Sequence, residues 1–301
     1  MRNTQIWGGR VTVTENAYAK INLYLDVTSR RADGFHTVKS VMHTVSLSDT
    51  VEITAFSSEK TVLELSCLPS GVLMEDGDNL VLRAAKSYLE KAGIQARLKI
   101  TLRKNIPLSA GLAGGSADAA ATLRALNRLY ENCLSDDELL SLAAYLGSDV
   151  PFCLVGGTAL CEGRGEMLTP IDNNASLHLV IAKGDEQIST PTAYAALDRE
   201  YEGFDGGESH GEEHLSELLS SLASGRAPTS LYNIFESVIE PTAQSITRIK
   251  SIMLECGARS VLMSGSGPSV FGIFEDASRR TEAIDTLRSA GYFAATADSA
   301  P

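Results

Sequence analysis

One segment of this 301-residue chain says most about its structure: Pro107-Leu108-Ser109-Ala110-Gly111-Leu112-Ala113-Gly114-Gly115-Ser116-Ala117-Asp118-Ala119-Ala120. Glycines and other small residues here precede a helical pattern that extends through Tyr130. A small-residue loop at the start of a helix exposes backbone N–H groups at the positive end of the helix dipole, and both favour a phosphate. On glycine content alone, a flexible loop or a close helix contact is an equal alternative. No Gly-Lys-Ser/Thr closes the segment, so it is not a Walker A loop.

Upstream of this loop, residues 18–27 alternate between an apolar and a polar face, and a period of two predicts a strand. The polar face carries Tyr18, Lys20, Asn22, Tyr24 and Asp26, and its simplest interpretation is exposure to solvent. An Asp-Gly turn is predicted at residues 31–34. Further strands are predicted at residues 37–47, 51–56, 61–66 and 98–102, and a helix from an Asp78 N-cap to Lys91, with Gly93 as its stop.

Downstream of the loop, Ser135 and Glu138 form a capping box, which predicts a helix to Leu146 that Gly147 ends. Asp149 then lies just past a helix C-terminus, where the dipole disfavours a negative charge. That costly placement suggests a function, although a turn aspartate that bonds nearby backbone is an equal alternative.

The second half of the chain predicts a ferredoxin-like domain with one additional helix. Its pattern is strand 178–182, helix 191–198, helix 241–255, strands 260–263 and 270–274, helix 278–289 and strand 292–296. Residues 201–228 are expected to be irregular and then partly helical. His210 and His214 could share a helix face there and hold a metal, although a solvated loop is the stronger interpretation.

The composition excludes several classes of protein. With 44% hydrophobic and 21% charged residues, the chain is typical of a globular protein. A formal charge of −12 argues against nucleic acid as a partner, because such partners need a basic surface. No apolar run reaches the roughly 20 residues of a membrane span, and residues 1–7 show no signal or transit pattern. Five scattered cysteines predict neither disulfides nor a zinc site, and favour the cytoplasm.

Two of these segments together resemble the GHMP kinases, the family of galactokinase, homoserine kinase and mevalonate kinase. They are residues 107–120 and the later Met263-Ser264-Gly265-Ser266-Gly267-Pro268-Ser269-Val270-Phe271. Three further segments resemble one branch of that family, whose substrate is a polyol linked to cytidine diphosphate in the non-mevalonate route to isoprenoids. They are Ala19-Lys20-Ile21-Asn22-Leu23, Arg31-Ala32-Asp33-Gly34-Phe35-His36-Thr37 and Leu146-Gly147-Ser148-Asp149-Val150-Pro151-Phe152.

The resemblance implies an α+β, two-domain GHMP kinase fold. Residues 1–165 would form an N-terminal mixed β/α domain that binds ATP and carries catalysis, and residues 166–301 a C-terminal ferredoxin-like α/β sandwich. It implies ATP and Mg²⁺ as cofactors, a small-molecule substrate whose 2-hydroxyl is phosphorylated, and an active site in the cleft between the domains. We expect a cytoplasmic monomer or homodimer with no membrane or nucleic-acid partner.

Residue roles follow from the same resemblance. Lys20 and Asp149 are the implied catalytic pair: Asp149 accepts the proton of the attacking hydroxyl, and Lys20 holds the carboxylate and the substrate oxygen. Residues 107–117 would bind the ATP phosphates, with Gly265 and Gly267 approaching from the other side and Asn79 and Lys104 near the adenine. Many relatives have glycine and serine where this chain has Ala113 and Ala117, which restricts the backbone and leaves Ser116 as the Mg²⁺ or phosphate ligand.

On the substrate side, the resemblance implies that Asn22 contacts the polyol and that Phe35 and His36 contact the cytosine. Many relatives have tyrosine at position 35, so stacking is retained and a hydroxyl contact is lost. In Thr190-Pro191-Thr192-Ala193-Tyr194, Thr190 would contact substrate and Tyr194 would form the other face of a cytosine sandwich. The alternatives are another GHMP kinase of the homoserine or mevalonate type, and a non-catalytic GHMP-fold sensor. Phe35 and His36 argue against the first, and the pair Lys20 and Asp149 against the second.

Overall fold

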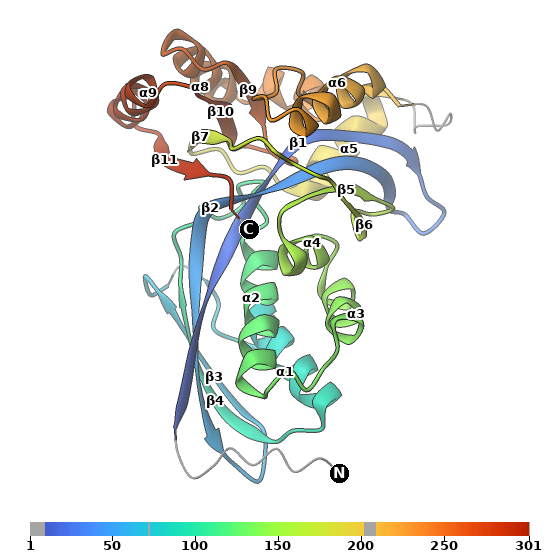
Figure 1. The fold of residues 1–301 in the computed structure, drawn as a ribbon, viewed down its shortest axis with the longest axis vertical. Coiled ribbons are helices and arrows are strands. Elements are labelled where there is room, and N and C mark those ends of the chain that lie inside the picture. The colour runs from blue at the N-terminus through green and yellow to red at the C-terminus, as the bar shows by residue number, and fades with distance from the viewer. Residues whose placement is uncertain (1–9, 72, 202–208, 301) are drawn as a thin grey trace. The chain divides into compact units, whose positions relative to one another are not determined.

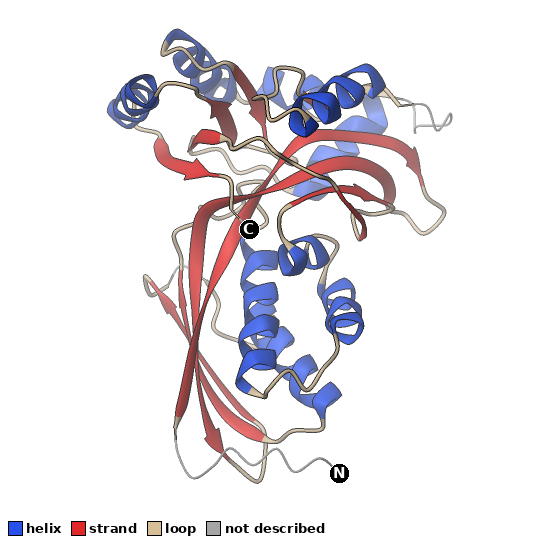
Figure 2. Ribbon diagram, in the orientation of Figure 1, coloured by secondary structure: helices blue, strands red, loops and turns tan. Residues whose placement is uncertain are grey.

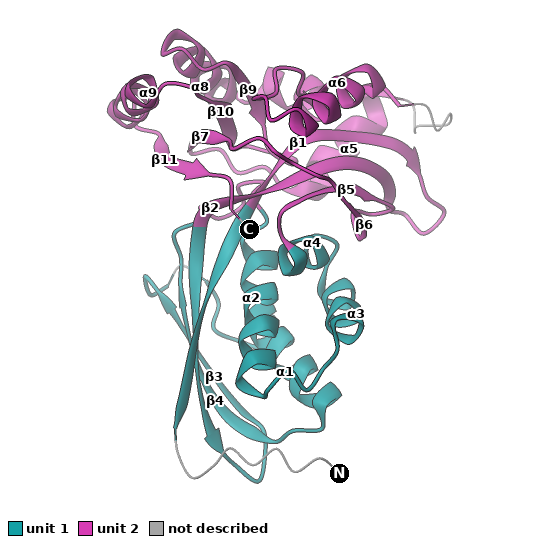
Figure 3. Cartoon of the chain, in the orientation of Figure 1, with its two compact units in different colours: residues 1–19, 48–106, 113–155 teal, residues 20–47, 107–112, 156–301 magenta. Residues whose placement is uncertain are grey.

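The structure is a computed structural model that describes residues 10–71, 73–201 and 209–300. Residues 1–7, where the sequence shows no targeting pattern, lie outside this range. Two compact units make up the chain (Figure 3). Unit 1 comprises residues 1–19, 48–106 and 113–155, and unit 2 comprises residues 20–47, 107–112 and 156–301. Both units therefore consist of several chain segments. The sequence analysis instead divided the chain once, into domains of residues 1–165 and 166–301, and that division stays a prediction.

Two long strands, β1 (Val11–Arg30) and β2 (His36–Ser57), contribute residues to both units. The remaining elements of unit 1 are β3 (Val62–Leu68), α1 (Leu80–Ala92), β4 (Ala96–Arg103), α2 (Gly114–Leu129), α3 (Asp136–Leu146) and α4 (Val150–Val155). β4 pairs antiparallel with β2 over Thr50–Ser57 and parallel with β3. The strands predicted at residues 37–47 and 51–56 are one continuous strand. The polar residues between them do not end it, because the carboxylate of Asp49 accepts from the backbone N–H groups of Asn105 and Ile106.

The core of unit 1 lies between its sheet and its helices (Figure 1). Alternation along β4 buries Leu98, Ile100 and Leu102 against this core, as the sequence predicted. Three apolar positions of α1, namely Val81, Ala85 and Tyr88, recur at helical spacing and are buried in the same core.

The helix ends of unit 1 follow local sequence signals, with one correction. Gly93 ends α1 in the left-handed conformation, at φ +68°, and the Ser135–Glu138 capping box begins α3, so both predictions are confirmed. The N-cap of α1 is Asn79 rather than Asp78. The Asn79 side chain accepts a hydrogen bond from the backbone N–H of Val81 at 3.0 Å, and this bond moves the start of the helix by one residue.

Unit 2 contains a four-stranded antiparallel sheet in the order β11-β7-β10-β9, which is the ferredoxin-like order and confirms that prediction. α8 and α9 pack their apolar residues against this sheet. In Figure 2 the helices are blue and the strands are red. The elements are β5 (Thr158–Glu162), β6 (Met167–Pro170), β7 (His178–Lys183), α5 (Thr190–Glu200), α6 (Glu212–Ala223), β8 (Tyr232–Asn233), α7 (Glu236–Ile239), η1 (Glu240–Thr242), α8 (Gln244–Glu255), β9 (Ser260–Met263), β10 (Val270–Ile273), α9 (Ala277–Ser289) and β11 (Phe293–Asp298).

Two local features of unit 2 differ from the sequence analysis. The helix predicted over residues 241–255 begins at Gln244, because Pro241 lies in the preceding 3₁₀ turn η1. The hairpin of β5 and β6 was not predicted. Gly163 and Gly165, both at positive φ, form its turn.

Within the described residues, no helix combines the length and the hydrophobicity that a membrane span requires. No disulfide links the five cysteines, all of which lie among the described residues.

Candidate active site

The glycine-rich segment, residues 107–117, contributes its first six residues to unit 2 and its remainder to unit 1. Ser109, Gly111 and Ala113 all adopt positive φ, at +49°, +73° and +56°. The left-handed conformation costs an alanine about 1–2 kcal/mol, so Ala113 keeps a backbone shape that glycine adopts freely. Ala113 is the N-cap of α2 and provides no side-chain hydrogen bond to the first turn. The backbone N–H groups there suit an anion, as the sequence indicated.

Gly111 brings this segment against the later glycine segment, within unit 2. A Cβ at Gly111 would lie 2.1 Å from the carbonyl oxygen of Ser264, and one at Gly265 would lie 2.9 Å from the carbonyl oxygen of Gly111. The hydroxyl of Ser264 donates to Gly111 O at 3.0 Å. A Cβ at Gly267, which is at φ +82°, would collide with the Met263 sulfur. The two glycine segments therefore meet backbone to backbone, and side chains would keep them apart.

Lys104 lies in a buried charge cluster of unit 1, which we call the Lys104 cluster: Lys104, Asp49 and Asp118. The ammonium of Lys104 donates to the carboxylates of Asp49 and, at 2.7 Å, Asp118. Burial alone would lower the pKa of Lys104, but the two carboxylates outweigh it and raise that pKa. Burial also raises the pKa of Asp118, to about 7, although Lys104 opposes the shift. Asp118 Oδ1 is buried and has no hydrogen-bond partner in the part of the chain that the structure describes.

The sequence analysis missed Asp49 and Asp118 as partners of Lys104. Asp118 lies in the quoted segment, but nothing local identifies its contact. The cluster also adjoins the start of α2, because a Cβ at Gly114 would lie 3.4 Å from Lys104 Nζ. The side chain of Asn79 caps α1, where its Oδ1 accepts from the N–H of Val81, and its Nδ2 donates to the carbonyl of Met74. A contact of Lys104 or Asn79 with adenine stays a prediction.

Lys20 lies on the polar face of β1, and this face is not solvated: Lys20, Asn22, Tyr24 and Asp26 are all buried. The interpretation of a solvent-exposed strand face is therefore wrong. Within unit 2, Lys20 Nζ donates to Asn22 Oδ1 at 2.7 Å and to Gly111 O at 3.2 Å. The implied catalytic lysine thus contacts both the implied polyol-binding residue and the glycine-rich segment.

Asp149 belongs to unit 1 and lies between α3 and α4. The N–H of Cys153 bonds to the carbonyl of Asp149, so this residue precedes the first turn of α4. The sequence analysis recognised only the end of α3, where a negative charge is disfavoured. The start of α4 favours that charge, so the placement is less costly than the sequence suggested. The pairing of Asp149 with Lys20 stays a prediction.

His36 contacts two residues that are one turn apart on α5. Its ring stacks on Tyr194 with centroids 4.6 Å apart, and Nε2 lies 2.6 Å from Asp198 Oδ1. His36 and Tyr194 thus lie in direct ring contact, and a cytosine sandwich formed by Phe35 and His36 on one face and Tyr194 on the other stays a prediction. Phe35 is 53% exposed, and the guanidinium of Arg164 lies 5.2 Å from its ring centroid. Thr190 Oγ1 lies 3.1 Å from Ser266 Oγ, which joins the start of α5 to the later glycine segment.

Asp26 anchors the chain that precedes α6. Its Oδ2 accepts from the hydroxyl of Ser209 at 2.8 Å and from the N–H of His210 at 2.7 Å. His210 therefore precedes α6 instead of sharing a helix face with His214, whose Nδ1 lies 3.0 Å from Ser230 Oγ. No group of metal-binding side chains occurs among the residues that the structure describes.

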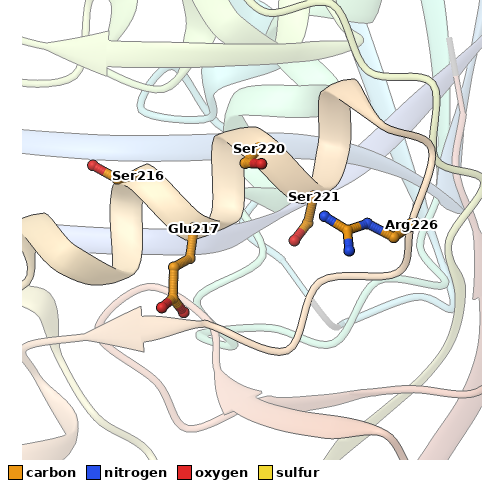
Figure 4. Close-up of a pocket in the computed structure, with 5 residues that line it drawn as sticks. All are labelled: Ser216, Glu217, Ser220, Ser221 and Arg226. Carbon is orange, nitrogen blue, oxygen red and sulfur yellow. The ribbon is translucent and has the colours of Figure 1, made fainter.

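A surface hollow on α6 is lined by Ser216, Glu217, Ser220, Ser221 and Arg226 (Figure 4). It contains none of the residues that the sequence assigned to nucleotide or substrate. Arg226 bonds to the hydroxyl of Ser224, so it serves the end of the helix.

Comparisons with known proteins show which family the chain resembles. The family models described as GHMP kinases N terminal domain and GHMP kinases C terminal match residues 79–157 and 212–292. A protein of Caldicellulosiruptor saccharolyticus named 4-diphosphocytidyl-2-C-methyl-D-erythritol kinase is 40% identical over 90% of this chain and 91% of its own. One of the same name from Geobacillus kaustophilus is 41% identical over 90% of this chain and 91% of its own.

Among solved structures, a 4-(cytidine 5'-diphospho)-2C-methyl-D-erythritol kinase superimposes with a TM-score of 0.79 at 33% identity, over 96% of this chain and 100% of the other. The chain therefore belongs to the GHMP kinases and, within them, to the family of 4-diphosphocytidyl-2-C-methyl-D-erythritol kinases. The resemblance and the α+β fold class are both confirmed.

Proposed function

We propose that this protein transfers the γ-phosphoryl group of ATP to the 2-hydroxyl of 4-diphosphocytidyl-2-C-methyl-D-erythritol, giving the 2-phosphate and ADP. The reaction serves non-mevalonate isoprenoid biosynthesis, in the cytoplasm, on a small molecule and without membrane or nucleic acid. The observation that carries the proposal is the buried bonding of Lys20 to both Asn22 and Gly111. It joins the first-strand motif to the glycine-rich segment, and relatives 40% and 41% identical over 90% of the chain bear this enzyme's name.

On the nucleotide side, residues 107–117 hold the phosphates with backbone N–H groups, and Gly265 and Gly267 complete the cradle. Ser116 has the one side-chain oxygen in the first turn of α2, because glycines precede it and Ala117 follows. Mg²⁺ prefers oxygen ligands and keeps several waters, so one hydroxyl together with ATP oxygens fits it. When bound, the ion neutralises the charge that develops on the phosphoryl oxygens.

In the chemical step, the 2-hydroxyl oxygen forms a bond to the γ-phosphorus as the bond from that phosphorus to the β–γ bridging oxygen breaks. Asp149 receives the hydroxyl proton, and ADP leaves with the electron pair. The ammonium of Lys20 stabilises the negative charge on the attacking oxygen. Such a positioned base contributes about 10²–10⁴-fold to the rate.

On the substrate side, Asn22 binds the methylerythritol, and Phe35, His36 and Thr190 bind the cytidine portion. Phe35 is exposed and can stack on the base. Because Tyr194 lies flat against His36, we assign Tyr194 the support of that imidazole. Asp198 fixes the ring in its plane through Nε2.

The test is turnover of purified protein with Mg²⁺-ATP and three alcohols in parallel: the cytidyl substrate, homoserine and mevalonate. Products are identified by mass. We expect phosphorylation of the cytidyl substrate only, and a raised KM for it in His36→Ala. Turnover of homoserine or mevalonate instead would refute the cytosine site and retain the kinase fold, and no turnover of any would favour the sensor alternative.

A further inference from the structure

Ser40 is a fully buried serine of β2 to which no role has been assigned above. Its hydroxyl lies 2.7 Å from the carbonyl oxygen of Tyr24 and 2.8 Å from Nδ2 of Asn22. Both neighbours are on the polar face of β1, and all three residues belong to unit 2. Ser40 therefore bonds directly to Asn22, the residue that holds the ammonium of Lys20.

Three hydrogen bonds link Lys20, Asn22, Ser40 and Tyr24 in a row, and the groups at the two ends of the row determine the direction of each bond. A carbonyl oxygen only accepts, so the single proton of the Ser40 hydroxyl goes to Tyr24 O. The Ser40 oxygen must then accept from the amide N–H of Asn22. At the other end an ammonium only donates, so Lys20 requires the amide oxygen of Asn22.

The order is therefore Lys20 to Asn22 to Ser40 to Tyr24, each residue donating to the next. A flipped Asn22 amide would turn an NH₂ group toward the ammonium and an oxygen toward a hydroxyl whose proton is already used. Amide oxygen and nitrogen are assigned from their bonding partners, and here both partners demand the same orientation.

We propose that Ser40 is a positioning residue of the phosphoryl transfer, which acts by locking the Asn22 amide so that its oxygen directs the Lys20 ammonium. The inference rests on the proposed function, because it concerns the group that contacts the attacking oxygen. The second acceptor of Lys20 is held in a similar way, since Gly111 O also accepts from the buried hydroxyl of Ser264. Two buried serine hydroxyls thus secure the acceptors described for this lysine.

Removal of the Ser40 hydroxyl leaves the Asn22 NH₂ without its acceptor, in an interior where an unmet donor is unfavourable. The Asn22 amide is then free to rotate, and its oxygen no longer holds the Lys20 ammonium in a fixed orientation. Loss of the partner that orients a metal ligand typically costs about 10–100-fold in affinity or activity, and we expect an effect of the same order for a partner that orients a directing amide. For Ser40→Ala we expect kcat to fall by about 10–100-fold and KM for ATP to change less than about threefold.

β2 offers a matched control four residues further along, in the same unit. The Thr44 hydroxyl is buried and has no hydrogen-bond partner among the described residues, so Thr44→Val removes a buried hydroxyl from the same strand without breaking a described bond. This variant should keep kcat within about twofold of the wild type. Ser40→Cys preserves the volume but offers a poor acceptor, and should lose part of the activity. It replaces Ser40→Ala if that variant does not fold.

The decisive measurement is a double-mutant cycle on kcat with Ser40→Ala and Asn22→Ala. If Ser40 acts through Asn22, Ser40→Ala costs 10–100-fold in the wild-type background and less than about twofold beside Asn22→Ala. Multiplying losses, or a Ser40→Ala or Ser40→Cys variant with wild-type kcat, would overturn the inference. The wild type is assayed on the three alcohols first. Failure on the cytidyl substrate refutes the proposed function, whereas wild-type turnover with an insensitive Ser40 refutes only the inference.

Discussion

Lys104 in unit 1 and Lys20 in unit 2 each place an ammonium group in the interior of a compact unit, and their surroundings differ. Lys104 lies between two carboxylates, Asp49 and Asp118. The bonds described for Lys20 go to an amide oxygen and a main-chain carbonyl. The two carboxylates neutralise the charge of Lys104, and the amide and main-chain oxygens that accept from Lys20 help to direct its ammonium.

The Lys104 cluster joins three separate pieces of unit 1. Asp49 comes from β2, Lys104 follows β4 and Asp118 lies in α2. Asp49 also accepts two backbone N–H groups just after Lys104, which fixes the chain there. Under the proposed function, we expect Lys104 to serve mainly the architecture and Lys20 mainly the reaction, so substitutions of the two lysines should differ in their effects on stability and on rate.

The largest expected effect is on the rate, from Lys20→Met. We expect kcat to fall by about 10²–10⁴-fold, because the charge that stabilises the attacking oxygen is lost. The free energy of unfolding should also fall, because the acceptors on Asn22 and Gly111 lose this buried donor, which costs about 1–3 kcal/mol. Steady-state kinetics and urea unfolding measure the two quantities. A kcat within tenfold of the wild type would remove the distinction between the lysines.

Lys104→Met should show its main effect on stability. Removal of one partner from a buried ion cluster leaves carboxylates uncompensated and costs about 3–5 kcal/mol. Urea unfolding measures this loss, and Lys99→Met is the matched control, because Lys99 lies on β4 with its side chain 53% exposed. If Lys104→Met were no less stable than Lys99→Met, the cluster would not be architectural.

Sequence predicted much of the local structure because the signals for it are local. The capping box of α3 needs only Ser135 and Glu138, and the stop of α1 needs only the positive φ of Gly93. The start of α1 was wrong by one residue, since Asp78 and Asn79 are both good caps and only the folded turn selects between them. Helix α4 was missed because its six residues are too few to show a period.

The environment of the site could not be predicted in the same way. Alternation places Lys20 and Asn22 on one face of a strand, but it does not tell whether water or protein covers that face. The cover includes Gly111 and Ser40, from other parts of the chain. Likewise, the stack of His36 on Tyr194 could not be predicted, because the sequence located helix α5 without its orientation toward His36.

The pH dependence of stability gives a further test of the Lys104 cluster. The pKa of Asp118 is raised to about 7 in the folded protein, so between its ordinary value of 3.8 and about 7 the folded state binds the extra proton. Its contribution to stability is full below pH 3.8 and is lost as the pH rises through 7, by up to about 1.4 kcal/mol per pH unit. Asp118→Asn should flatten this loss in urea unfolding between pH 5 and 8. If the free energy of unfolding of Asp118→Asn changed with pH as it does in the wild type, Asp118 would not be the group that binds this proton.

The smallest expected effect comes from His43 in unit 2, and it has the opposite sign. Burial lowers the pKa of His43 from 6.5 to about 4, and its ring nitrogens lie 2.8 Å from Thr158 Oγ1 and 2.9 Å from Ser299 Oγ. The unfolded state binds the proton first as the pH falls from 6.5 to 4, so stability falls over that window, again by up to about 1.4 kcal/mol per pH unit.

Between pH 4 and 6.5 the contributions of His43 and Asp118 therefore oppose each other in the whole chain, and single variants are needed to separate them. Asp118→Asn should steepen the acid loss of stability, His43→Gln should reduce it, and His178→Gln, at an exposed histidine, is the control for the second. If Asp118→Asn and His43→Gln shifted the pH dependence in the same direction, the opposite signs given to the two buried groups would be wrong.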